Sequence, residues 1–276
     1  MNVLTQEYNN RGISQSNRLK LELLHRGGQD VYSTEEIAQL WNMPLPPTTR
    51  LLAHLAESGW LVRVRRGFYA VTPLEASQPH TWKIDPWISA QKTYAPCYIG
   101  GWSAGEHWGL TEQIFRDLLV VTGCPVRHTR QKIQESHLSL HHRDQARHFG
   151  VELVWRGQAR VPVSDPSKTV IDFLADPRWA GGIRHGAEML VAYFEDHLDE
   201  PKLLDYSERL GIRTVYKRLG YLTELLDLGS SHLRSTCHDR LSKGISDLDP
   251  SSPCQGPILT DWALRINVRI LRDRSA

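Results

Sequence analysis

A change of hydrophobic period within residues 33–71 constrains the fold of this chain more than any other feature of its sequence. The stretch begins with helical spacing, and Ser33 followed by Glu36 is the pattern of a capping box, which starts a short helix. A run of prolines ends that helix. A second helix then begins near Pro47, because proline suits the first helical turn, and Ser58-Gly59 ends it.

After Gly59 the apolar residues recur with a period of two, which is the spacing of a β-strand. The first strand is predicted to divide its side chains between two faces, with Val62 and Val64 on one and Arg63 and Arg65 on the other. Arg66-Gly67 forms a tight turn, and residues 68–71 return as the second strand. Two helices followed by a basic hairpin are typical of a winged helix-turn-helix, a unit that reads DNA.

The second helix and the hairpin carry the side chains expected at a DNA surface. The predicted DNA-binding residues of this domain are Thr48, Thr49, Arg50, His54, Arg63, Arg65 and Arg66. Hydroxyl and guanidinium groups suit both phosphates and base edges, so this set favours DNA binding. The alternative is a winged helix that docks only on protein, with a basic hairpin that is merely a solvated edge.

Length and composition indicate a soluble protein of two domains. The chain has 276 residues, 40% of them hydrophobic, and no apolar run near the roughly 20 residues that span a bilayer. Its start shows no signal peptide, so we expect a cytoplasmic protein. The formal net charge is only +2, so any DNA contact must come from local clusters. We predict a DNA-binding domain over residues 1–78 and a second domain over residues 79–276.

The second domain mixes helical and strand patterns, so the predicted fold class is α+β: a winged helix-turn-helix followed by a mixed α/β domain. Helices are expected at 82–90, at 103–108 with Ser103 as cap, from Asp165, and repeatedly from Gly182. Strands are expected at 98–99, 118–122, 138–142 and 151–155, with a short edge piece at 161–163. An extended surface loop is expected after Leu228, and a final strand from Trp262 that returns to the sheet.

A second basic cluster lies in this domain. Arg127, Arg130 and Lys132, with Arg143 and Arg147 further on, outnumber the acidic Glu135 and Asp144. The first three are predicted to add phosphate contacts to those of the wing. A solvated sheet face is the alternative interpretation of the same residues.

Three arrangements suggest chemistry, and each has a simpler interpretation. Gly100-Gly101-Trp102-Ser103 is similar to the Gly-Ser turn of nucleotidyltransferases, but the Asp247 and Asp249 pair is far away in a loop, so a strand-to-helix bend is expected. The histidines at 137, 141, 142 and 148 lack partners at metal-ligand spacing. Lys168 and Asp172, next to Asp165, have the i, i+4 spacing of a surface ion pair.

No other catalytic or cofactor signature is visible. The four cysteines form no Cys-x-x-Cys pair and are interpreted as reduced structural residues. The sequence has no P-loop and no Gly-x-Ser-x-Gly turn. We therefore expect neither an enzyme nor a bound metal or cofactor.

Four segments together resemble one family, the AbiEi-type antitoxins of type IV toxin–antitoxin systems. They are residues 58–71 (SGWLVRVRRGFYAV), 99–111 (IGGWSAGEHWGLT), 163–174 (VSDPSKTVIDFL) and 262–268 (WALRINV). The resemblance implies a winged helix joined to an α/β antitoxin domain, and repression of the protein's own promoter at inverted repeats. It also implies a nucleotidyltransferase toxin encoded next to the gene, countered without a stable complex. It supplies no catalytic residues.

Two other functions stay open at this point. One is a transcription regulator whose second domain senses a small ligand, with a pocket lined by Trp82, Trp87, Trp102 and Trp108, although core packing is the commoner use of such residues. The other is an enzyme of unrecognised type. A nucleotidyltransferase reading frame directly downstream would favour the antitoxin over the ligand sensor.

Overall fold

A computed structural model describes residues 13–72, 83–157 and 159–270 of the chain. The chain divides into two compact units, one of residues 1–85 with 157–159 and the other of residues 86–156 and 160–276. The predicted boundary at residue 78 lies outside the described residues. Within those residues, no helix has both the length and the apolar character needed to cross a membrane.

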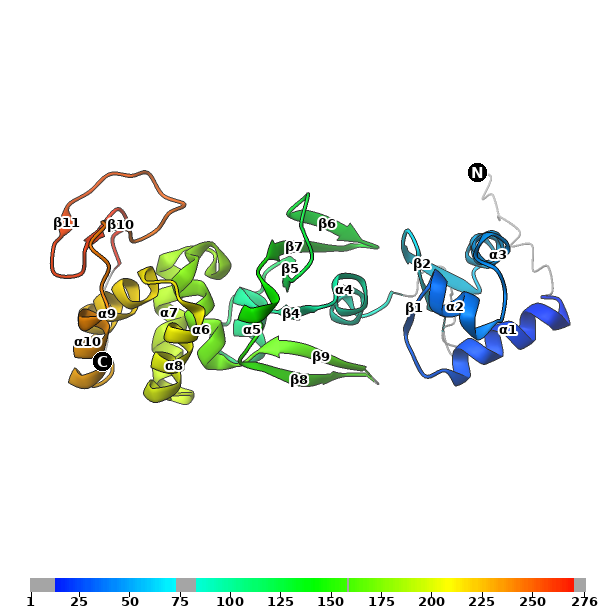
Figure 1. Cartoon of the computed structure of the whole chain (residues 1–276), viewed down its shortest axis with the longest axis horizontal. Coiled ribbons are helices and arrows are strands. Elements are labelled where there is room, and N and C mark those ends of the chain that lie inside the picture. The colour runs from blue at the N-terminus through cyan, green and yellow to red at the C-terminus, as the bar shows by residue number, and fades with distance from the viewer. Residues whose placement is uncertain (1–12, 73–82, 158, 271–276) are drawn as a thin grey trace, which may run out of the picture. The chain divides into compact units, whose positions relative to one another are not determined.

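The first unit is a winged helix-turn-helix, as the sequence predicted (Figure 1). Its elements are α1 (Gln15–Arg26), β1 (Val31–Ser33), α2 (Thr34–Leu40), α3 (Leu45–Glu57), β2 (Leu61–Arg65) and β3 (Phe68–Val71). The strands form an antiparallel sheet in the order β1-β3-β2. Leu24, Ile37, Leu52 and Leu55 pack into one core beneath the three helices, and each is almost fully buried.

Short sequence motifs determine where the helices and the wing turn of the first unit begin or end. The Ser33 hydroxyl accepts a hydrogen bond from the backbone N–H of Glu36, and the Glu36 carboxylate accepts one from Ser33 N–H, so the capping box is complete. Helix α3 begins at Leu45, two residues before the predicted Pro47, with Pro44 as its N-cap. Gly67 takes a φ of +84° in the wing turn, a conformation that favours glycine.

The wing departs from the predicted alternation. Its register shifts between Arg63 and Arg65, so one extra residue stands in β2. As a result Leu61 and Val64 are buried, whereas Val62 is only half-buried. The arginines keep their predicted exposure, because the bulge moves the valines and leaves Arg63 and Arg65 facing solvent.

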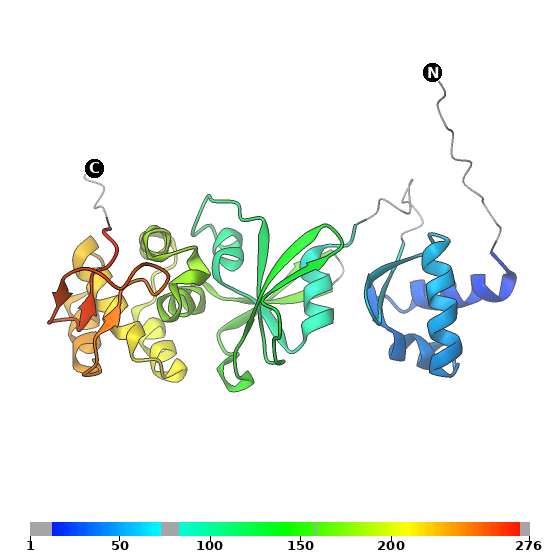
Figure 2. The ribbon, with the colours of Figure 1, turned by 90° about the horizontal axis from the view of Figure 1, so that it is seen from above.

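The second unit is built on a mixed six-stranded sheet (Figures 1 and 2). Its first elements are α4 (Pro86–Tyr94), β4 (Cys97–Ile99), α5 (Gly101–His107), β5 (Asp117–Thr122), β6 (Arg130–Ile133), β7 (Ser136–His142), β8 (Val151–Arg156) and β9 (Ala159–Ser164). The strand order is β6-β7-β5-β4-β9-β8, with short 3-10 turns at Gln145–Arg147 and Pro177–Ala180.

Two sequence predictions fail within this sheet. The predicted edge piece at 161–163 belongs to β9, which lies between β4 and β8, so the edge is β8. Alternating Val161 and Val163 are both fully buried, which suits an interior strand. Ser103 lies inside α5 and is not its cap, since α5 begins after Gly100 and the Ser103 hydroxyl accepts a hydrogen bond from Leu119 N–H at 3.0 Å.

Helices complete the second unit. They are α6 (Pro166–Ala175), α7 (Ile183–Asp196), α8 (Glu200–Leu210), α9 (Thr214–Leu226) and α10 (Ser231–Asp239). Asp165 caps α6 as predicted, because its carboxylate accepts from Lys168 N–H at 2.7 Å. The prediction of a loop after Leu228 is wrong for its first part, because α10 forms there. The Ser230 hydroxyl caps this helix by accepting a hydrogen bond from Leu233 N–H.

The C-terminal segment forms a small sheet of its own. Strands β10 (Ser246–Asp247), β11 (Ile258–Leu259) and β12 (Leu264–Arg265) pair in the order β10-β12-β11, so the predicted final strand does not return to the main sheet. Buried Arg218 of α9 holds this segment, since its guanidinium donates to the carbonyl oxygens of Asp247 and Leu248 at 2.9 and 3.0 Å. Figure 1 shows the segment beside α9 and α10.

Candidate nucleic-acid interface

Helix α3 offers one exposed polar face. Leu52 and Leu55 face the core, whereas Thr49, Arg50 and His54 are exposed. Arg50 and His54 are four residues apart and therefore lie on the same side of the helix. The N-terminal turn of α3 contains two prolines without N–H groups, so any reading by this helix depends on side chains more than on backbone donors.

Thr48 does not belong to that face. Its side chain is fully buried, and its hydroxyl donates to the carbonyl oxygen of Pro44 at 2.9 Å. The structure therefore removes Thr48 from the predicted DNA surface. The sequence suggested it because its hydroxyl, like that of Thr49, suits a DNA surface. Thr49 is exposed, and its hydroxyl donates to the Leu45 carbonyl oxygen in the same way.

The wing places three arginines in solvent. Arg63 and Arg65 project from β2, and Arg66 occupies the turn. The Arg65 guanidinium lies 5.7 Å from the centre of the Phe68 ring across the hairpin. Thr34 of α2 donates from its N–H and its hydroxyl to the Gly67 carbonyl at 2.8 and 3.2 Å, which ties the wing turn to the helical part of the unit.

The second basic cluster lies on the β6–β7 hairpin and the loop before it. Arg127, Arg130 and Lys132 are all exposed, in agreement with a surface role. Arg130 lies opposite Ser139 and Lys132 opposite His137 in the register of the two strands. Lys132 forms an exposed ion pair with Glu135 at 3.5 Å, so part of its charge is already neutralised.

Lys168 and Asp172 form a buried charge cluster and not the predicted surface pair. Both side chains are fully buried, and Asp172 accepts hydrogen bonds from Lys168, from Arg143 at 2.7 Å and from the Tyr98 hydroxyl at 2.8 Å. Burial lowers the pKa of Lys168, while Asp172 opposes that change. Burial and the Asp172 charge both raise the pKa of Tyr98 well above its usual value.

The cluster is explained by packing alone. Every Asp172 oxygen has a donor, and the Arg143 guanidinium stacks 4.4 Å from the centre of the Trp179 ring. The i, i+4 spacing of Lys168 and Asp172 is the same whether a helix faces water or a core. Their burial could be suspected from the flanking Val170, Ile171 and Phe173, which are also fully buried.

The residues similar to a nucleotidyltransferase site have other partners. The Asp249 carboxylate accepts from the backbone N–H of Ile183, at the start of α7, at 2.8 Å. The Asp247 carboxylate pairs with Arg265 at 3.0 Å. Across the described part of the chain, no group of three or more His, Cys, Asp or Glu side chains could hold a metal ion.

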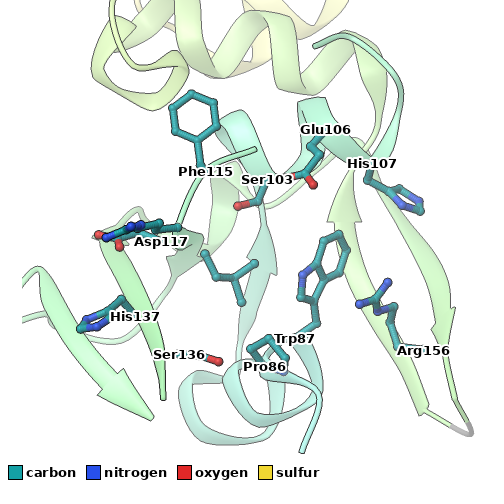
Figure 3. Close-up of a pocket in the computed structure, with 12 residues that line it drawn as sticks. Pro86, Trp87, Ser103, Glu106, His107, Phe115, Asp117, Ser136, His137 and Arg156 are labelled. Atoms are coloured by element: carbon teal, nitrogen blue, oxygen red, sulfur yellow. The ribbon is translucent and has the colours of Figure 1, made fainter. Parts of the chain in front are cut away.

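A cavity of about 430 Å³ lies on the second unit between α4, α5 and the sheet (Figure 3). Figure 3 shows Trp87 and Arg156 on one side of it and Asp117 and His137 on the other. Of the tryptophans expected to line a pocket, Trp87 lines this cavity. The indole N–H groups of Trp102 and Trp108 donate to backbone carbonyls at 2.7 and 2.6 Å, and Trp82 lies outside the described residues.

Comparison with known proteins supports the family resemblance of the first unit. Residues 21–72 match a family described as "Transcriptional regulator, AbiEi antitoxin". The matched segment runs from α1 to the end of the wing, so the resemblance found in the sequence is confirmed there.

A solved structure shares the fold of most of the chain. The crystal structure of the RV2827C protein from Mycobacterium tuberculosis superposes with a TM-score of 0.62 over 92% of each chain. Its sequence is only 15% identical, so this likeness concerns the fold alone. No curated protein matches the sequence.

Proposed function

Because residues 21–72 match a family of antitoxin transcriptional regulators, we propose that this protein is a DNA-binding autorepressor and the antitoxin of a type IV toxin–antitoxin system. The observation that carries the DNA-binding part is the shared exposure of Arg50, His54 and the wing arginines on one compact unit. The tie from Thr34 to Gly67 supports it, because it fixes the wing turn beside the helices.

The proposed binding mode divides the interface into two kinds of contact. Arg50 and Thr49 on α3 approach base edges in the major groove, where guanidinium forks discriminate between bases. Arg63, Arg65 and Arg66 of the wing contact phosphates, as do Arg127 and Arg130 of the second unit. The protein acts in the cytoplasm, and its four free cysteines accord with a reducing compartment.

The proposed partner is a nucleotidyltransferase toxin encoded by the adjacent gene, which the antitoxin opposes without forming a stable complex. This part rests on the family match and on the wider sequence resemblance. The test has two arms. We expect the protein to repress a reporter driven by its own promoter, and to restore growth to cells that express the adjacent reading frame.

The two arms separate the two parts of the proposal. Repression without growth rescue would leave a transcription regulator that is not an antitoxin. Rescue without repression would remove autoregulation and keep the antitoxin. Loss of both results would overturn the proposal.

A ligand-sensing regulator is the second candidate, and the cavity on the second unit favours it. Its lining combines Trp87 and Phe115 with the charged Glu106 and Asp117. A metabolite that bound there and changed the affinity of the whole protein for its promoter DNA would support this candidate.

A further inference from the structure

Strand β8 (Val151–Arg156) stands at one edge of the six-stranded sheet. It has β9 on its inner side, and no strand in the described part of the chain pairs with its outer side. Leu153 and Trp155 are 58% and 60% exposed, and as alternate residues they share one face of the strand. An edge strand of this kind is a template for another strand unless proline, lysine or a covering element protects it, and β8 contains neither residue.

The sequence of β8 is complementary to itself. When two copies pair antiparallel about a two-fold axis at Val154, Glu152 of each copy lies opposite Arg156 of the other. The same register places Leu153 opposite Trp155. Each dimer then has two opposite-charge pairs and two apolar pairs, and directly opposed residues of both kinds stabilise a sheet.

We propose that β8 is a dimerisation strand, and that two copies of this chain join through it into one continuous sheet across a two-fold axis. The second copy is the occupant because this register gives each of Glu152, Leu153, Trp155 and Arg156 a complementary residue of the same strand. Such an interface is isologous, because both copies use the same surface: Glu152 of each copy meets Arg156 of the other.

The opposite edge of the sheet, strand β6, is not complementary to itself. Strand β6 (Arg130–Ile133) carries two exposed basic residues in four positions. Pairing β6 with itself about its midpoint would place Arg130 opposite Ile133 and Gln131 opposite Lys132, with no opposite-charge pair. Basic residues on an edge protect against pairing when they find no acidic counterpart, as in β6, whereas Arg156 of β8 meets Glu152. Of the two edges of this sheet, β8 therefore has the character of an interface.

Cross-linking through a cysteine at the two-fold axis tests the register. Val154→Cys is introduced in a background with Cys124→Ser and Cys254→Ser, because these two native cysteines are exposed. Opposed residues of an antiparallel pair have Cα atoms roughly 4.5–5.5 Å apart, which lies within the range of a disulfide. We expect mild oxidation to give a covalent dimer. The control, Lys132→Cys on β6, should stay monomeric, and equal cross-linking of the two variants would overturn the proposal.

A charge exchange tests the pairing itself by sedimentation velocity over a range of concentrations. We expect wild type to dimerise reversibly with a micromolar dissociation constant, since the interface is small. Glu152→Arg should weaken dimerisation about tenfold. It places the new arginine of each copy opposite Arg156 of the other, which makes two like-charge pairs in each dimer. The double variant with Arg156→Glu should recover most of that loss.

Arg156 also lies 4.8 Å from the centre of the Trp87 ring, so Arg156→Glu removes a contact within the protomer. The double variant is therefore compared with the Arg156→Glu single variant, whose folding is checked by circular dichroism. A wild-type protein that stays monomeric at several hundred micromolar would overturn the proposal. So would a double variant that dimerises no better than either single variant.

Discussion

Arg50 and Arg65 have the same side chain but stand on different elements of the winged unit, one on α3 and the other in the wing. We expect Arg50→Ala to weaken binding to the operator by about 1–3 kcal/mol more than binding to random DNA, because a base contact is lost. Arg65→Ala should weaken both DNAs equally and lower the salt slope by about one unit, because a phosphate contact is lost. Fluorescence anisotropy titrations at several salt concentrations measure both effects.

The control for Arg50 is Arg50→Lys, which keeps the charge and loses the two-pronged fork. This variant should retain binding to random DNA while losing preference for the operator. Equal losses on both DNAs for Arg50→Ala would assign that residue to phosphate and leave base reading to another side chain.

Asp172 is the residue on which the buried cluster of the second unit depends. Asp172→Asn would leave Lys168 and Arg143 without their carboxylate, and removing one partner of a buried pair costs about 3–5 kcal/mol. Lys168→Met should cost less, because Asp172 keeps Arg143 and Tyr98 as donors. Urea unfolding measures both.

The matched control is Arg178→Ala, which removes the largely exposed partner of Asp176 and should change the free energy of unfolding by about 1 kcal/mol or less. Similar free energies for Asp172→Asn and Arg178→Ala would show that the cluster adds nothing to stability. A larger loss for Lys168→Met than for Asp172→Asn would place the critical charge on the lysine instead.

At the scale of secondary structure, Asp249 stabilises α7 from outside that helix. Gly182 is the residue before α7 and has no side chain to cap it, and the Asp249 carboxylate accepts the Ile183 N–H in its place. We expect Asp249→Ala to lower the free energy of unfolding by about 0.5–2 kcal/mol, the usual cost of losing a cap. The measurement is again urea unfolding.

Asp205→Ala is a suitable comparison for Asp249→Ala, because Asp205 is exposed. Its carboxylate forms a surface ion pair with the Arg209 guanidinium at 3.6 Å. The substitution should change stability by a few tenths of a kcal/mol. Asp249→Asn should keep part of the cap, because an amide oxygen can still accept the N–H bond. No loss in Asp249→Ala would mean that α7 does not depend on this contact.

Some features of the helices and strands could be predicted from nearby residues, and others could not. The capping box at Ser33 and Glu36, the Asp165 cap and the glycine turn of the wing were predictable because each depends on residues a few positions apart. The bulge in β2 was not, because a bulge depends on how β2 pairs with β3. The partners of the buried Lys168 and Asp172 were not predictable either, because Tyr98 and Arg143 are far from them in sequence.

Much of the candidate DNA surface was predictable for the same reason. A basic hairpin after two helices places its arginines in solvent by the alternation of a strand, and Arg63, Arg65 and Arg66 are exposed. Thr48 could have been separated from Thr49 by the helical period, since Thr48 stands four and seven residues before the buried Leu52 and Leu55 and so shares their face. The edge position of β8 required the whole sheet order, which no single segment contains.

At the scale of the molecule, the second basic cluster predicts that DNA binding is shared between the units. Replacing both Arg127 and Arg130 by alanine should lower the salt slope by about two units on operator and random DNA alike, if each contacts one phosphate. Lys132→Ala should have a smaller effect, because Glu135 already pairs with that side chain. An unchanged slope in the double variant would confine DNA binding to the winged unit.

The division into two compact units allows antitoxin function to be assigned by fragments. Each unit has its own hydrophobic core, so residues 1–85 and 86–276 are suitable pieces. We expect the first fragment to bind promoter DNA more weakly than the whole chain and to give no protection from the toxin. The second fragment should restore growth without repressing the promoter, because three of the four antitoxin-like segments lie beyond residue 85.

Growth of cells that express the adjacent reading frame measures this assignment, with the whole chain as the positive control. Folding of each fragment is checked by circular dichroism, so that an unfolded fragment is not mistaken for an inactive one. Rescue by residues 1–85 and not by residues 86–276 would move antitoxin function to the winged unit. If both folded fragments fail while the whole chain succeeds, protection requires the two units in one chain.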